Sequence, residues 1–408
     1  MRIAVYHSLP AGGARRVVNS AVPLLGRRHH VDLFTIDLAP VSRSDLGLND
    51  PHSGVSGLVR AQLPLRALAR ISTPASPLHV PAITVRLGIA ESSLAKTIDA
   101  GGYDVCWVHH SLHIHAPFLL RHLATPTLYF VEEPRRRSFE ALAVRSPHAT
   151  VPAPLAGPAW ALERFLRHAD SKSTSRATAI AANSAFTAEA VLRAYGRSAW
   201  VCHLGVDHEF FAPAARREDH LDHPPYVMAV GALDWIKGHE LALDAVALMG
   251  APRPRVVIVY ERSAPGYAGV LQRRAQRSGV ELELRRGISD HQLCQLYRGA
   301  MATLCLSRLE PFGLTALESL CTGTPVVALG EGGFRETVVD GRNGYVVEPE
   351  AQSVRDAIEA VRVGRLGADR SAVRRSVVPH FTLPAMVDRL ESLLERTVTL
   401  ARSGQGST

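Results

Sequence analysis

The sequence predicts an α/β protein with two domains, each a doubly wound parallel sheet, and three observations lead to this prediction. The chain has 408 residues, which exceeds one ordinary core and suits two domains of about 200 residues each. Apolar, strand-like runs alternate with amphipathic, helix-like stretches, the pattern of parallel strands joined by helices. A polar segment with prolines at residues 207–225 interrupts the alternation, which then restarts.

In the first half, short apolar runs that end in polar or turn-forming residues predict the strands. The predicted strands cover residues 2–8, 29–36, 103–110, 125–134, 177–184 and 198–207. Helical spacing of apolar residues predicts the helices between them, at residues 14–28, 117–123, 160–170 and 187–196. Residues 40–95 are irregular and rich in Ser, Pro and Leu, and we expect helices and a mobile loop there. A polar, Arg- and Pro-rich stretch covers residues 134–158.

In the second half the same alternation is more regular. The predicted strands cover residues 225–233, 253–261, 280–287, 302–307 and 324–330. The predicted helices cover residues 238–250, 267–279, 290–300 and 312–323, and a final helix spans about 383–402.

These patterns divide the chain into domains. We expect the first domain at residues 1–206, a linker at 207–225 and the second domain at 226–382, with the final helix packing back on the first domain. Ligands of doubly wound sheets bind beyond the carboxyl ends of the strands. A two-domain arrangement therefore predicts a site in the cleft between the domains.

The composition indicates a globular protein, with 46% hydrophobic and 21% charged residues. No stretch approaches the roughly 18 to 20 apolar residues of a membrane span, and the chain opens directly into a strand-like run without a secretory-signal pattern. We therefore expect a cytoplasmic location. The five cysteines are scattered and odd in number, without a C-x-x-C pair, which argues against a disulfide framework and a zinc site.

The positive charge lies in the first half. Residues 1–206 carry 22 Lys+Arg against 13 Asp+Glu, a net charge of +9, whereas residues 207–408 carry 24 against 25. This asymmetry is compatible with a phosphate- or lipid-linked ligand, and with peripheral contact at the inner face of a membrane. Because 43 of the 46 basic residues are arginine, genome composition is an alternative cause. Nucleic acid is not expected as a partner, since no aromatic-basic stacking pattern accompanies the arginines.

The most informative stretch holds two glutamates around a Phe-Gly-Leu turn. Glu310 follows the predicted strand 302–307, at the edge where ligands bind. Gly313 and the residues after it form a first helical turn, whose free N–H groups suit a phosphate. Glu318 lies further into the helix, and an ionised carboxylate accepts hydrogen bonds from two vicinal hydroxyls. The set suits a sugar nucleotide; a solvated Glu318 and simple helix-dipole complementarity remain the alternative.

The residues SRLEPFGLTALESLCTGTPVVALGEGGFRETVVDGRNGYVVEP (307–349) resemble the signature of retaining glycosyltransferases of family 4 with the GT-B fold. The shared pattern is Glu-x7-Glu, Gly-x-Pro-Val-Val, Gly-Gly-x-x-Glu and a glycine-bearing hairpin. Further matches are VGALDWIKGHELALDAV, GISDHQLCQLYRGAMATLCLS, ANSAFTAEAVLRAYG with HLGVDHEFFAP, and LPAGGARRV near the N-terminus. The resemblance covers nearly the whole chain and implies two Rossmann-like domains.

The resemblance implies roles for residues of the second half. Glu310 would hold hydroxyls of the donor sugar, Glu318 the ribose, and Lys237 the diphosphate. The other residues that it places at the donor are Phe312, Gly313, Leu314, Thr315, Arg286, Gly287 and Ile288. One position departs from the family: Ala232 stands where an arginine is usual. Arg262, after the strand 253–261, is a candidate to replace that cation.

In the first half the expected site faces the acceptor. Gly12 and Gly13 follow the first strand, where a glycine pair permits close approach of a ligand or simply makes a turn. By resemblance, His109 at the end of the strand 103–110 would contact the donor sugar, with His110 as the second choice. Glu133 and Arg135 are expected at the acceptor mouth.

No metal and no cofactor are expected. Neighbouring histidines of a strand point to opposite faces, which disfavours a histidine metal site, and the sequence lacks the Asp-x-Asp that metal-dependent glycosyltransferases use. The resemblance implies retention through front-face attack. The expected function is transfer of a hexose from a UDP- or GDP-sugar to a hydroxyl of a natural product, an envelope glycan or a lipid-linked intermediate. The alternatives are a non-catalytic sugar-nucleotide-binding relative and a sugar-nucleotide epimerase.

Overall fold

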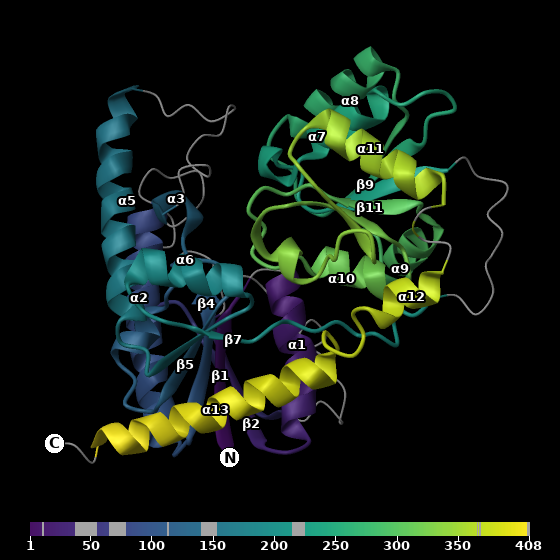
Figure 1. Cartoon of the computed structure of the whole chain (residues 1–408). Helices are drawn as coiled ribbons and strands as arrows, with labels where there is room; N and C mark the ends of the chain where they lie inside the picture. The colour runs from purple at the N-terminus through teal and green to yellow at the C-terminus, as the bar shows by residue number, and fades with distance from the viewer. Residues whose placement is uncertain are drawn as a thin grey trace. The chain divides into compact units, whose positions relative to one another are not determined.

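The computed structural model contains two compact units (Figure 1). One unit consists of Met1–His203 together with Met386–Thr408, and the other of Leu204–Ala385. The structure describes residues 1–9, 12–36, 55–64, 79–111, 114–139, 153–213, 225–364, 366 and 369–405. The first unit thus ends three residues before the boundary predicted at 206 and includes most of the final helix. Residues 214–224 of the predicted linker lie outside the described residues.

The first unit holds a parallel sheet of seven strands in the order β3-β2-β1-β4-β5-β6-β7. The strands are β1 (Arg2–Ser8), β2 (His30–Ile36), β3 (Val55–Ala61), β4 (Val105–Ser111), β5 (Thr127–Val131), β6 (Ala179–Ala182) and β7 (Trp200–Val201). The helices are α1 (Gly13–Gly26), α2 (His79–Ala100), η3 (Phe118–Arg121), α3 (Arg136–Phe139), α5 (Ala153–Thr174), α6 (Ala185–Tyr195) and α13 (Leu383–Gln405). The strand order reverses between β1 and β4.

Both faces of this sheet are buried, as the apolar strands require. Ala4 and Tyr6 of β1 pack in a core cluster with α2, η3 and α5. The alternate residues Ile3 and Val5 are also fully buried, so the opposite face is covered as well. The doubly wound arrangement predicted from the sequence is confirmed.

Two stretches of the first unit differ from their predictions. The part of residues 40–95 that the structure describes holds β3 and the 22-residue α2, whereas the expected mobile loop falls outside the described residues. The helix predicted at 117–123 is a single 3₁₀ turn, η3, after Pro117. Such a turn is the usual form for so short a segment.

The second unit holds a parallel sheet of six strands in the order β10-β9-β8-β11-β12-β13. The strands are β8 (Tyr226–Val230), β9 (Arg255–Tyr260), β10 (Leu282–Arg286), β11 (Ala302–Cys305), β12 (Val326–Leu329) and β13 (Gly344–Val347). The helices are η4 (Trp235–Lys237), α7 (His239–Ala247), α8 (Tyr267–Ser278), α9 (Asp290–Gly299), α10 (Leu314–Cys321), η5 (Gly332–Glu336), α11 (Ala351–Arg362) and α12 (Arg370–Arg375). Here the order reverses between β8 and β11.

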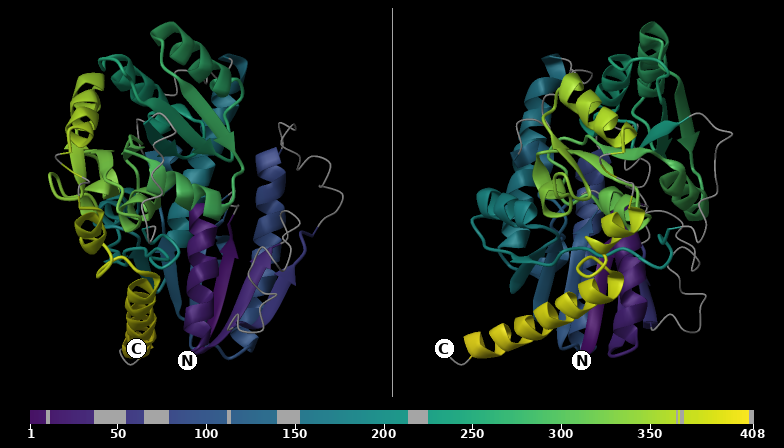
Figure 2. Two further views of the ribbon diagram at one scale, coloured as in Figure 1. Left: turned by 90° about the vertical axis from the view of Figure 1, so that its right-hand side faces the viewer. Right: turned by 45° about the vertical axis from the view of Figure 1, so that its right-hand side comes forward.

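The final helix, α13, lies beside the N-terminal end of the chain in the first unit (Figures 1 and 2). Glu391 accepts from His29 and from Arg28, each at 2.7 Å. Leu390 and Leu394 are fully buried. Because exposed ion pairs contribute little, burial of these apolar side chains holds the helix in place. None of the helices in the described ranges is both long and apolar enough to cross a bilayer.

Candidate functional site

In the second unit, the predicted donor residues surround the reversal point between β8 and β11. Gly231 follows β8, and Leu306 to Glu310 follow β11. The two strands are neighbours, with Thr303 paired to Met228. Ligands of doubly wound sheets bind at such a point, because the loops from the two strands diverge there.

Lys237 and Glu310 meet at this edge. Lys237 ends the short helix η4, which Asp234 caps by accepting a hydrogen bond from the Ile236 N–H. Its Nζ lies 2.8 Å from Glu310 Oε2, and the two side chains are 28% and 20% exposed. Gly238 lets this turn pack closely on the residue that follows β11, since a Cβ there would lie 2.2 Å from the Leu306 carbonyl oxygen. The two side chains are therefore held in fixed positions and remain accessible to a ligand.

The loop that carries Glu310 is held by the segment after β12. Glu331 pairs with Arg308 through two contacts of 2.8 Å, and it accepts from the Leu309 N–H at 3.3 Å. Leu309 adopts a φ of +48°, which is uncommon for a residue with a side chain. The Glu310 carbonyl accepts from the Gly333 N–H at 2.8 Å. Glu331 was not predicted as a site residue, although it lies directly before the Gly-Gly pattern at residues 332–333.

The helix α10 begins beside this loop. Phe312 is buried and contacts the ring of Phe381. Gly313 precedes the helix with a φ of +94°, and a Cβ there would lie 2.4 Å from the Phe334 ring. Leu314 and Thr315 form the first turn, whose N–H groups have no partner within the helix. The N–H groups of this first turn can donate to an anion.

Glu318 is buried in α10. It is 4% exposed and accepts a hydrogen bond from the Tyr297 hydroxyl at 2.9 Å. The alternative of a solvated Glu318 is therefore wrong, because the apolar face of α10 packs this carboxylate against α9. Tyr297 was not identified from the sequence, since a tyrosine in an apolar helical stretch is indistinguishable from an ordinary core residue.

The other residues that were expected at the donor lie at or just after the ends of β9 and β10. Arg286 and Gly287 are exposed, and Gly287 has a φ of +63° and donates to the Tyr260 carbonyl at 3.1 Å. Ile288 follows and is half-buried. The Arg262 carbonyl accepts from the Leu233 N–H at 2.8 Å. Arg262 therefore belongs to the segment beside Ala232, and its side chain is exposed.

In the first unit, the predicted histidines lie at the carboxyl end of β4. His109 is fully buried and contacts the rings of Trp107 and Phe130, and His110 is 16% exposed in its side chain. Glu132, which follows β5, lies 3.7 Å from His109 Nδ1 and 3.9 Å from His110 Nδ1. The neighbouring Glu133 was the residue predicted from the sequence, because the sequence alone does not show which of two adjacent glutamates faces the histidines.

Other acceptor-side candidates have different surroundings. Arg135 makes two contacts with Glu163, at 3.2 and 3.3 Å, and Glu133 lies 3.9 Å from Arg136. Gly12 has a φ of +151° with open space beside it, and Gly13 begins α1. The structure thus brings Glu132 rather than Arg135 to the histidines.

Burial lowers the pKa of three histidines in the first unit, His7, His109 and His115. It lowers the pKa of His7 to about 3, with a smaller effect from His109 and Arg15, and it lowers the pKa of His109 to about 3. The pKa of His115 is also lowered to about 3. Burial raises the pKa of Glu132. The imidazoles are therefore neutral at physiological pH.

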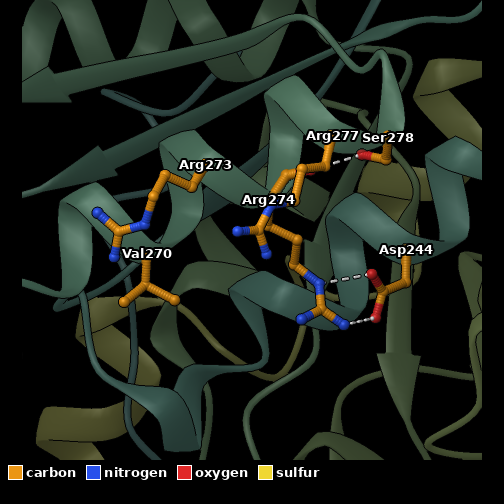
Figure 3. Close-up of a pocket in the computed structure, with 6 residues that line it drawn as sticks. All are labelled: Asp244, Val270, Arg273, Arg274, Arg277 and Ser278. Carbon is orange, nitrogen blue, oxygen red and sulfur yellow. Dashed lines mark hydrogen bonds and ion pairs between the residues drawn. The ribbon is translucent and has the colours of Figure 1, made fainter.

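A surface hollow elsewhere in the second unit is a weaker candidate. It has a volume of about 420 Å³, and Figure 3 shows Arg273, Arg274 and Arg277 lining it, with Arg274 paired to Asp244. It lies at the carboxyl end of α8, which leads into β10. That end adjoins the amino ends of the strands, opposite the edge where doubly wound sheets bind ligands. Among the described residues, no group of three or more His, Cys, Asp or Glu side chains could hold a metal ion.

Comparison with solved structures defines the fold class. Sucrose-phosphate synthase from Thermosynechococcus elongatus aligns with a TM-score of 0.73 and 21% identity, covering 97% of this chain and 98% of that one. HepE from Anabaena, solved in complex with UDP, aligns with a TM-score of 0.69 and 18% identity over 97% of this chain and 100% of that one. The chain has the GT-B fold of glycosyltransferases, as the resemblance predicted.

The sequence comparisons give similarities for part of the chain. Residues 213–363 match the family model described as glycosyl transferases group 1. D-inositol 3-phosphate glycosyltransferase of Geodermatophilus obscurus is 32% identical over 200 residues, 44% of each chain. The enzyme of the same description from Mycobacteroides abscessus is 32% identical over 222 residues, 50% of this chain and 48% of that one. The matches span about half the length of these curated relatives.

Proposed function

We propose that the protein is a retaining glycosyltransferase that moves a hexose from a UDP- or GDP-sugar to a hydroxyl acceptor. The observation that carries this proposal is the Lys237–Glu310 pair at the strand ends of a group 1 glycosyltransferase domain, 2.8 Å apart and accessible. The nearby N-terminus of α10 and the buried Glu318 complete a set of groups suited to a diphosphate between two sugars.

Each group has a role in this proposal. Lys237 and the first N–H groups of α10 hold the diphosphate and stabilise the charge that develops as it leaves. Glu310 accepts from hydroxyls of the hexose, and Glu318 accepts from the ribose. Phe312, Gly313, Leu314 and Thr315 supply main-chain contacts. We propose that the reaction needs no metal or other cofactor, since Lys237 and the helix terminus provide the positive charge.

The proposed chemistry retains the configuration at the anomeric carbon. The acceptor oxygen bonds to that carbon on the face from which the diphosphate departs. The bond to the phosphate breaks, and the leaving phosphate oxygen takes the acceptor proton. No covalent enzyme intermediate is required.

The relatives support a nucleotide-sugar donor. HepE, of the same fold, was solved with UDP-glucose, and the curated relatives are described as glycosyltransferases. We assign the acceptor to the first unit, near the ends of β1, β4 and β5. The net charge of +9 on residues 1–206 is compatible with an acceptor that carries a phosphate or a lipid, and with a cytoplasmic enzyme at the membrane's inner face.

Ligand-dependent melting tests the proposal. UDP or GDP at millimolar concentration should raise the melting temperature, and ADP should not. A nucleotide sugar with the responding base should then be hydrolysed slowly without acceptor, and mass spectrometry should detect hexose transfer when candidate acceptors are added. Binding without release of the nucleotide would indicate a non-catalytic relative. A melting temperature unchanged by all three nucleotides would contradict the donor assignment.

A further inference from the structure

A single carboxylate on the segment after β12 contacts both residues that directly precede Glu310. Glu331 accepts from Arg308 Nε at 2.8 Å, and its other oxygen lies 2.8 Å from Arg308 Nη2, so the two groups form a bidentate pair. The same carboxylate accepts from the Leu309 N–H at 3.3 Å. Glu331 therefore acts on a side chain and on the backbone of the loop that leads to Glu310.

Leu309 has a backbone conformation that leucine seldom adopts. Its φ is +48°, and in the described ranges it is the only residue other than glycine with a positive φ. The left-handed region brings the Cβ too close to the backbone and costs free energy for any residue with a side chain. Such a conformation persists only where neighbouring groups hold it. Because Glu310 is the next residue, the groups that hold Leu309 also decide where Glu310 points.

Main-chain contacts fix the residues on either side of Leu309. The Arg308 N–H donates to the Ile236 carbonyl at 2.9 Å, and the Glu310 carbonyl accepts from the Gly333 N–H at 2.8 Å. The Leu309 N–H differs, because it donates to the side-chain carboxylate on the segment after β12. A substitution of that side chain therefore removes the contact at Leu309 and leaves the two main-chain contacts in place.

The carboxylate has a defined place because the two loops pack closely. A Cβ at Gly332 would lie 2.3 Å from the Glu310 carbonyl oxygen, so glycine is needed directly after Glu331. The side chains of Arg308 and Glu331 are 34% and 20% exposed, and ion pairs of this exposure contribute little to stability. The effect of the pair is therefore on the position of the loop more than on the stability of the fold.

We propose that Glu331 is a positioning residue that holds Leu309 in the left-handed conformation and thereby sets the direction of the Glu310 carboxylate. Its effect on catalysis rests on the proposed function, in which Glu310 accepts from hydroxyls of the hexose. When Leu309 relaxes, the Glu310 carboxylate moves away from those hydroxyls, whereas the N–H groups at the start of α10 still meet the diphosphate. Glu331 acts through Leu309 and takes no part in the chemical step.

Hydrogen exchange of the full chain without ligand tests the positioning. Glu331→Gln keeps the shape of the side chain, but its single amide oxygen cannot serve both the guanidinium and the Leu309 N–H. Amide exchange within residues 307–310 should become at least about fivefold faster, because a weakened hydrogen bond opens more often.

Glu283→Gln is the matched control for this measurement. Glu283 lies on β10 of the same unit and pairs with Arg255 at 3.0 Å, with side chains 30% and 19% exposed. It should leave the exchange of residues 307–310 unchanged. Both variants should melt within about 2 °C of the parent chain, because partly exposed ion pairs contribute little to stability.

Donor hydrolysis without acceptor tests the consequence for catalysis. The probes are UDP-glucose and GDP-glucose, and the one that the parent chain hydrolyses is used. Glu331→Gln should lower kcat/KM about tenfold while the Kd of the free nucleotide changes less than about threefold, since a misplaced group loses catalysis before it loses remote binding. In a chain that carries Leu309→Gly, Glu331→Gln should lower kcat/KM less than about threefold, because glycine adopts the left-handed conformation without the steric cost.

Three outcomes would overturn the proposal. Exchange of residues 307–310 that Glu331→Gln leaves unchanged would show that Glu331 does not hold the loop. An equal loss of kcat/KM with and without Leu309→Gly would show that Glu331 does not act through this conformation. A nucleotide Kd that weakens as much as kcat/KM would show a general disturbance of the site. A chain with faster exchange that binds neither UDP nor GDP would support the role of Glu331 and refute the donor assignment, so the two failures are distinguishable.

Discussion

Lys237 Nζ and Glu310 Oε2 lie 2.8 Å apart and join the loop after β8 to the loop after β11. The residues are 73 positions apart in sequence. They meet because β8 and β11 are neighbours at the point where the strand order reverses. An ion pair of this partial exposure contributes little to stability, so its effect is to orient two groups that a ligand can reach.

Replacing Lys237 should reduce catalysis more than stability. Lys237→Ala removes a cation that we place beside the leaving diphosphate, and a loss of about 10²–10³ in kcat is expected. Initial rates of nucleotide release at saturating donor measure this loss in kcat.

Arg262→Ala tests whether that exposed arginine compensates for Ala232, and a loss of about tenfold in kcat is expected. Turnover unchanged in Arg262→Ala would refute the compensation.

Glu310 should act on the sugar rather than on the nucleotide. Glu310→Gln is expected to lower kcat/KM for the nucleotide sugar about tenfold or more, while the Kd of the free nucleotide changes less than threefold. The amide accepts hydrogen bonds from the sugar hydroxyls more weakly than the carboxylate does, whereas the contacts to the diphosphate remain. Calorimetry with UDP or GDP and steady-state kinetics separate the two. A double-mutant cycle with Lys237→Ala should give less than the sum of the single effects, since the residues are in contact. Additive effects would argue that the pair does not act together.

The Tyr297 hydroxyl should hold the Glu318 carboxylate in position for the nucleotide. Tyr297→Phe removes the hydroxyl that donates to the buried carboxylate at 2.9 Å, and a loss of about 1–3 kcal/mol in unfolding free energy is expected, together with weaker nucleotide binding. Tyr226→Phe is the control, because its hydroxyl donates to the Leu296 carbonyl at 2.7 Å. It should lower stability but leave nucleotide affinity unchanged. Equal affinity losses in both variants would show that Tyr297 has no special connection to the site.

Regular periodicity and local motifs were enough to predict the doubly wound fold and the segment around Glu310. The partners of these residues were not predictable. Tyr297 lies 21 residues before Glu318, and Glu331 lies 23 residues after Arg308, so neither contact follows from a local pattern. The two contacts form only when α9, β11 and β12 are assembled. Glu132 was missed for another reason: strand alternation places adjacent residues on opposite faces, and the sequence alone does not say which glutamate faces the histidines.

The glycines after β12 should be needed to position Glu310. A Cβ at Gly333 would lie 2.3 Å from the Pro311 carbonyl oxygen and 2.6 Å from Phe312 Cα, so Gly333→Ala must displace the loop that carries Glu310. We expect a loss of about 1–3 kcal/mol in unfolding free energy and a fall of more than tenfold in kcat/KM. Gly250→Ala is the matched control, because nothing lies within 4 Å of its Cβ position. Comparable losses in both variants would mean that the steric argument is wrong.

The pH dependence of stability should contain a contribution from a carboxyl group in the core of the first unit. Glu91 is fully buried, where it accepts from the Tyr6 hydroxyl at 2.7 Å and from the Leu119 N–H at 3.2 Å. Burial raises the pKa of Glu91 from 4.5 to about 7. Between these two pH values the folded state binds more protons than the unfolded state. The Glu91 contribution to the unfolding free energy therefore falls as pH rises from 4.5 to 7, by about 3 kcal/mol.

Glu91→Gln should remove this contribution while keeping the hydrogen bonds, because an amide oxygen can accept from the Leu119 N–H and the Tyr6 hydroxyl can accept from the amide. The buried histidines His7, His109 and His115 titrate with the opposite sign, since their lowered pKa values cost stability as the pH falls below 6.5. They are present in both proteins and cancel in the difference. Urea unfolding of both proteins at pH 5, 6, 7 and 8 should therefore show the variant gaining stability relative to the parent as the pH rises, levelling off above pH 7. A difference that stays constant across this range would mean that Glu91 keeps an ordinary pKa in the folded chain.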